Sequence, residues 1–165
     1  MKKFTLVLLF SLCHAGAQGF RETASAWAEH YARAYGVPAE FVKAVIDVES
    51  DWQPNVVSSK GAAGIMQLTP PAAFTFGVMN RFRVNENIRG GVAYLAHLMR
   101  LFNGELRLVA AGYYAGEARI QKVGLHCADP DICRYVAAVE RFYRKRRLAA
   151  IGSGRTEFIK GASQQ

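Results

Sequence analysis

The sequence predicts an all-α protein with a single folded domain, and two observations support this fold class. Apolar residues recur at intervals of three and four along most of the 165 residues, which is the period of amphipathic helices. Hydrophobic residues make up 51% of the chain and charged residues 21%, a composition typical of one domain with a buried core. No internal repeat divides the sequence.

The first 17 residues have the features of a secretory signal peptide. Lys2 and Lys3 precede an apolar run over residues 4–12, and Ala15-Gly16-Ala17 matches the small-residue rule for cleavage. We therefore expect export to the periplasm and a mature chain that begins at Gln18. A retained membrane anchor is the alternative, although the apolar run is short for crossing a bilayer.

The formal net charge of +8 is typical of proteins that bind an anionic polymer or membrane surface. No nucleic-acid-binding motif accompanies it, so we expect no nucleic acid partner. Cys127 and Cys133 would be the cysteines left after cleavage, and their short separation predicts a disulfide loop in an oxidising compartment. His126 lies next to Cys127, but no further residues have the spacing that a metal site requires. We therefore expect no metal and no other cofactor.

The helices follow from the apolar pattern and from stop and cap residues. Thr69 and Asn85 are predicted N-caps. Helices are predicted over residues 23–35, 38–50, 70–77, 85–102, 105–115 and 118–123, and from 130 onward. The basic end of the last helix is expected to be solvated, with binding to wall, lipid or a partner as the alternative. Residues 149–165 are expected to form a flexible tail.

Glu49 lies on the apolar face of the predicted helix over 38–50, four residues after Val45 and three after Ile46. Asp47 and Lys43 fall on other faces and are expected to point toward water. An ordinary glutamate has a pKa of about 4.3 and is ionised at neutral pH, but an apolar environment raises that pKa. Glu49 could thus hold a proton for acid catalysis. Taken alone, a glutamate at a helix end is more often a surface residue.

The residues that follow Glu49 strengthen the catalytic interpretation. Glu49-Ser50-x-Trp52-x-Pro54, Ser58 and the Gly-Ala-x-Gly-Ile-Met-Gln-Leu-x-Pro segment over 61–70 resemble the opening motifs of soluble lytic transglycosylase domains. That family is similar in fold to goose-type lysozyme. Segments around Asn87, Tyr94 and Tyr135 resemble later family helices, so the resemblance covers roughly residues 24–146. It implies a lysozyme-like domain over 18–148 with a substrate cleft.

The family motif Ala-Tyr-Asn falls within residues 111–116 and is changed in this sequence. Tyr113 matches the family tyrosine, whereas Tyr114 stands where the family has asparagine. The resemblance implies that Glu49 is the single catalytic acid and then base, with Tyr113 holding its carboxylate or the sugar. The residues that it implies for glycan binding are Ser58, Met66, Gln67, Tyr113, Tyr114 and Tyr135.

Some of these residues have a structural alternative. Met66 could be a core residue and Ser58 a turn cap, and Tyr135 is expected to approach Glu49 from the last helix. Asp51 and Glu117 are the nearest alternative carboxylates. We expect Asp51 to be a surface residue and Glu117 to stabilise the helix dipole at the start of a helix.

Three functions remain open at this point. The first is a peptidoglycan lytic transglycosylase, acting as a monomer that opens the wall locally for a secretion, conjugation or pilus apparatus. The second is a muramidase, in which water replaces the sugar hydroxyl. The third is a wall-binding assembly factor without catalysis.

Overall fold

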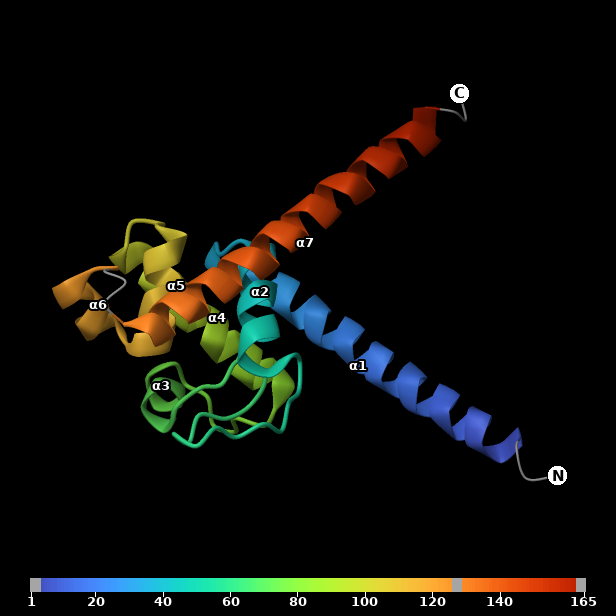
Figure 1. Ribbon diagram of the computed structural model, residues 1–165, viewed down its shortest axis with the longest axis horizontal. Helices are drawn as coiled ribbons and strands as arrows, with labels where there is room; N and C mark the ends of the chain where they lie inside the picture. The colour runs from blue at the N-terminus through green and yellow to red at the C-terminus, as the bar shows by residue number, and fades with distance from the viewer. Residues whose placement is uncertain (1–3, 126–128, 163–165) are drawn as a thin grey trace.

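Seven helices form the part of the chain that the structure describes, which confirms the predicted all-α fold class (Figure 1). The computed structural model describes residues 4–125 and 129–162, with side chains for 18–125 and 129–152. The helices are α1 (Phe4–Tyr35), α2 (Ala39–Ser50), α3 (Pro70–Thr75), α4 (Val84–Leu101), α5 (Leu106–Ala115), α6 (Glu117–Val123) and α7 (Pro130–Ala162).

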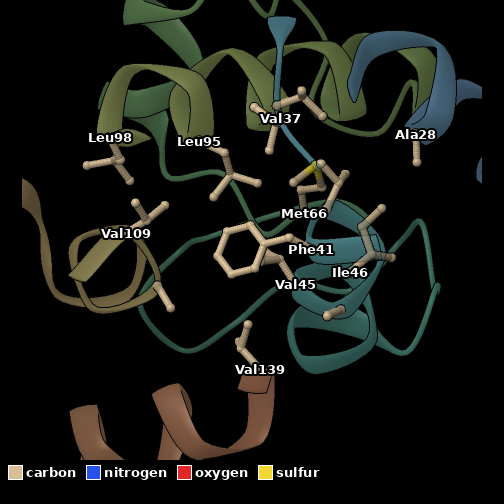
Figure 2. Close-up of a cluster of buried hydrophobic side chains, with 14 of the residues drawn as sticks. Ala28, Val37, Phe41, Val45, Ile46, Met66, Leu95, Leu98, Val109 and Val139 are labelled. Carbon is tan, nitrogen blue, oxygen red and sulfur yellow. The ribbon is translucent and has the colours of Figure 1, made fainter. Parts of the chain in front are cut away.

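The helix α2 lies at the centre of the packing. It contacts α1 and α7, while α1 also packs along α4, and α5 contacts α4, α6 and α7. Apolar side chains from these helices meet in one cluster, shown in Figure 2 with the buried Phe41, Val45 and Ile46 of α2. Because α2 presents its apolar face to several helices at once, a side chain on that face is largely removed from water.

Two helices are longer than the sequence predicts. The first begins at Phe4 instead of Thr23, and α7 continues to Ala162 through the segment expected to be a flexible tail. No proline interrupts either stretch, and extending a helix costs much less than starting one. Both helices project from the body of the molecule (Figure 1). Helical continuity does not test cleavage after Ala17 or a domain boundary at 148, which stay predictions.

Among the described residues, no helix combines the length and the apolar character that crossing a membrane requires.

The predicted ends of two helices are partly wrong. Thr69 is the N-cap of α3 and accepts a hydrogen bond from Ala72 N, as predicted, but α3 ends at Thr75. Helix α4 begins at Val84, one residue before the predicted cap Asn85. The Glu86 carboxylate binds two backbone N–H groups of the preceding loop, and this holds the chain in position for an earlier start.

Asp47 is buried, which corrects the expectation that it points toward water. Its side chain is 4% exposed and accepts two hydrogen bonds from Arg146, at 2.6 and 2.7 Å, and one from Trp52 Nε1 at 2.7 Å. The guanidinium groups of Arg21 and Arg146 also lie over the Trp52 ring, 5.4 and 5.5 Å from its centroid. Helical spacing did not show this, because Arg146 arrives from α7, which crosses α2.

The connecting loop, residues 51–69 between α2 and α3, is held by the buried side chain of Asn87. Its Oδ1 accepts from Met66 N at 2.8 Å, and its Nδ2 donates to Ala63 O at 3.0 Å and Arg81 O at 2.7 Å. Gly64 passes so close that a Cβ there would lie 2.1 Å from Arg81 O, and its φ of +84° also favours glycine.

We predict that Asn87→Ala lowers the free energy of unfolding by about 3 kcal/mol, because it removes three hydrogen bonds and leaves Met66 N and Arg81 O without a partner, while Ala63 O keeps its bond from Leu68 N. Chemical denaturation measures this loss. Asn85→Ala is the matched control, because Asn85 is exposed and holds one backbone N–H beside it. Equal losses in the two variants would contradict the role given to Asn87.

Candidate active site

Glu49 lies in the last turn of α2, where the apolar face of the helix meets α7. Its neighbours on that face, Val45 and Ile46, are fully buried, and Glu49 itself is half-buried. The Tyr135 hydroxyl on α7 donates a hydrogen bond of 2.6 Å to Glu49 Oε1. Burial raises the pKa of Glu49 from 4.5 to about 7, and the Tyr135 hydrogen bond opposes part of that rise. A large fraction of Glu49 is therefore protonated at neutral pH.

Two phenols lie near the Glu49 carboxyl, the half-buried Tyr113 and the buried Tyr135. The Tyr113 hydroxyl donates to Met66 O at 2.7 Å, which joins α5 to the connecting loop. Burial raises the pKa of both Tyr113 and Tyr135 well above the ordinary value, and the negative charge of Glu49 raises each further. Both hydroxyls thus remain protonated donors across the physiological pH range.

Tyr114 lies on the outer side of Tyr135. The two rings are stacked, with centroids 4.7 Å apart and planes inclined by 23°. Tyr114 is 43% exposed, whereas Tyr135 is 8% exposed. The structure therefore brings together Glu49, Tyr135 and Tyr114, which the sequence selected from three separate segments.

The other predicted site residues hold the connecting loop in this structure. The Met66 side chain is fully buried against Gly91, which is the core position left open as an alternative. Gln67 Nε2 donates to Val56 O and Gly64 O, both at 2.9 Å. Ser58 Oγ accepts from Ala62 N at 3.1 Å, as the turn-cap alternative expects. The Met66 side chain is thus shielded from a ligand, whereas Ser58 and Gln67 are half-buried.

The rival carboxylates lie in different surroundings. The side chain of Asp51 is 73% exposed, as expected. Glu117 begins α6 and pairs with His97 Nε2 at 2.6 Å. Neither has the apolar environment that surrounds Glu49.

Sequence reasoning missed structural roles for Ser50 and Tyr94. The buried Ser50 hydroxyl donates to Ile65 O at 2.7 Å and so ties the connecting loop to α2 beside Glu49. Tyr94 packs on Tyr113 at 5.1 Å between centroids, and burial followed by the charge of Glu117 raises its pKa to about 12. The position of Ser50, four residues after Ile46 on the buried face, is a signal that could have identified it.

Cys133 near the start of α7 is disulfide-bonded. Cys127 lies outside the described residues, so the pairing of the two stays a prediction.

The raised pKa of Glu49 predicts a dependence of stability on pH. Between about pH 4.5 and 7 the unfolded chain loses the Glu49 proton while the folded chain keeps it, so this group makes the protein less stable as pH rises. Glu49→Gln removes that titration. We expect the variant to melt on the order of a few degrees above the parent at about pH 8, and no such advantage at about pH 4. An equal difference at both pH values would contradict the raised pKa.

Comparison with known proteins gives consistent matches. A family model described as the transglycosylase SLT domain matches residues 26–132. The membrane-bound lytic murein transglycosylase F 1 of Alkalilimnicola ehrlichii is 33% identical over 58% of this chain, and the alignment covers 20% of that protein. A relative named lytic murein transglycosylase F from Shewanella oneidensis is 47% identical over 31% of this chain and 11% of its own length. The chain therefore spans about a fifth or less of the curated relatives that it matches.

Solved structures agree on the fold. An inactive glutamate-to-glutamine mutant of the lytic transglycosylase Slt from Pseudomonas aeruginosa has a TM-score of 0.63 and 27% identity, covering 72% of this chain and 23% of that one. The 70 kDa soluble lytic transglycosylase of Escherichia coli has a TM-score of 0.63 and 23% identity over 74% of this chain and 24% of its own. These similarities show an all-α, lysozyme-like fold. The family model matches most of this chain, from residue 26 to residue 132. The chain therefore belongs to the transglycosylase SLT domain family.

Proposed function

We propose that this protein is a peptidoglycan lytic transglycosylase that cleaves the β-1,4 bond between N-acetylmuramic acid and N-acetylglucosamine. The observation that carries the proposal is the half-buried Glu49 carboxyl, with a pKa of about 7, in a chain of this family. Two of its relatives are named lytic murein transglycosylases, which supports the same activity here.

Glu49 would act twice in the reaction. As a protonated acid it donates its proton to the glycosidic oxygen, so that the bond to the leaving sugar breaks. The acetamido oxygen of the muramic sugar supports the positive charge that develops at the anomeric carbon, so no second carboxylate is required. The ionised Glu49 then accepts the proton of the muramic C6 hydroxyl as that oxygen bonds to the anomeric carbon, which gives a 1,6-anhydro product.

The surroundings of Glu49 suit both roles. Burial favours the neutral acid before bond cleavage, while the Tyr135 hydrogen bond stabilises the carboxylate that results. In this proposal Ser58 and Gln67 face the glycan from the connecting loop, and Tyr113 and Tyr114 line the site from α5. Met66 contributes through its carbonyl, which positions Tyr113, because its side chain is buried.

We also propose a periplasmic location and a role in local wall opening for a secretion, conjugation or pilus apparatus. The support is the signal-peptide pattern of residues 1–17, together with the excess of basic residues, which suits an anionic surface such as the cell wall. Deletion in the source bacterium should impair assembly of one such apparatus and leave growth intact. Unimpaired assembly of all of them would contradict this role.

We predict that Glu49→Gln lowers the rate of peptidoglycan digestion at least about 100-fold, because the amide cannot donate a catalytic proton. Release of soluble fragments from purified sacculi measures the rate. Asp51→Asn is the matched control, since it removes a neighbouring carboxylate that is exposed to solvent, and it should digest at the parental rate. Digestion by Glu49→Gln at the parental rate would rule out Glu49 as the acid.

Mass spectrometry of the fragments identifies the reaction. Anhydromuramic ends are the expected product. Reducing ends would instead assign the protein as a muramidase, and the absence of any fragment would favour a wall-binding factor.

A further inference from the structure

Tyr114 is the one site residue that departs from the family pattern, and it contacts the group that binds Glu49. It lies in the last turn of α5, 43% exposed, with its ring stacked on Tyr135 at 4.7 Å between centroids. Tyr135 in turn places its hydroxyl 2.6 Å from Glu49 Oε1. A continuous contact thus runs from α5 through α7 to the carboxyl on α2.

We propose that Tyr114 is a positioning residue: its ring packs against the face of the Tyr135 ring, restricts movement of that side chain about χ1 and so keeps the Tyr135 hydroxyl on Glu49. The effect on catalysis rests on the function proposed above, whereas the effect on the Tyr135–Glu49 hydrogen bond does not.

Such a support would strengthen the contact, because a hydrogen bond weakens steeply when its angle departs from linear. Tyr135 reaches Glu49 across the contact between α7 and α2, so a small rotation of its side chain about χ1 displaces the hydroxyl. Offset stacking at this separation is a favoured arrangement of two aromatic rings and restricts that rotation. The asparagine that the family has at this position carries no ring and cannot provide the same restriction.

The titratable groups around Glu49 determine the direction of the effect. Tyr135 faces it from α7 and Tyr113 from α5. Tyr94 on α4 interacts with Tyr113, and Glu117 on α6 interacts with Tyr94. The Tyr113 hydroxyl is committed to Met66 O, which leaves Tyr135 as the phenol that donates to Glu49. That bond favours the ionised carboxylate, so loosening Tyr135 should raise the pKa of Glu49.

The test is the titration of Glu49 in the full chain, followed by carbon-13 NMR of the glutamate carboxyl groups. Comparison with Glu49→Gln assigns the Glu49 signal. We expect Tyr114→Ala to raise the titration midpoint by about half a pH unit, because it removes the stack. Tyr114→Phe keeps the ring and should keep the parental midpoint. Tyr35→Ala is the matched control, since Tyr35 is 39% exposed and lies at the end of α1.

A second experiment, in the Tyr135→Phe background, distinguishes positioning of the Tyr135 hydroxyl from a general change in the burial of Glu49. In Tyr135→Phe the hydrogen bond is already lost, so adding Tyr114→Ala should change the Glu49 midpoint no further. Circular dichroism confirms that each variant is folded. An unchanged or lowered midpoint in Tyr114→Ala would overturn the proposal, and so would an equal rise in the Tyr135→Phe background.

Activity provides an independent reading. With purified peptidoglycan, the alkaline limb of the rate profile should move upward in pH together with the Glu49 midpoint in Tyr114→Ala. A rise in KM with no movement of that limb would make Tyr114 a platform for a sugar ring and overturn the positioning role. If the parent chain digests no peptidoglycan, the proposed function fails, while the NMR titration still decides the role of Tyr114.

Discussion

The hydrogen bond from Tyr135 to Glu49 is the contact on which the site depends. It joins residues 86 positions apart, at the place where α7 crosses the end of α2. Burial and this hydrogen bond act on the carboxyl in opposite directions, and burial is the larger effect, so the pKa comes to about 7. A general acid is most effective when its pKa lies near the working pH, so this balance suits Glu49 to the acid role proposed for it.

The polar residues around the site mainly hold backbone in place. Asn87, Gln67 and Ser50 each bind carbonyl or N–H groups of the connecting loop, which has little regular structure of its own. A loop without helix or sheet hydrogen bonds needs such partners when it is buried. The same residues that give the sequence its recognisable motif therefore give the loop its shape beside Glu49.

The sequence predicted those features that depend on the spacing of nearby residues or that resemble a known family. The spacing of Val45, Ile46 and Glu49 predicted the buried face, and the resemblance brought Tyr135 into the site. The burial of Asp47 could not be predicted, because it depends on Arg146 reaching α2 from another helix. Met66 shows a related limit, since hydrophobic character does not distinguish a cleft wall from the core. The full lengths of α1 and α7 were missed because composition alone does not show where a helix ends.

The most direct test of the account is whether the Glu49 carboxyl carries a proton near neutral pH in the free protein. Infrared difference spectra between the parent and Glu49→Gln isolate the C=O stretch of this one protonated carboxyl as pH is varied. The account predicts that the band persists in mildly acidic buffer and disappears with a midpoint near 7. Disappearance of the band near 4.5, the ordinary value for a glutamate in water, would contradict it.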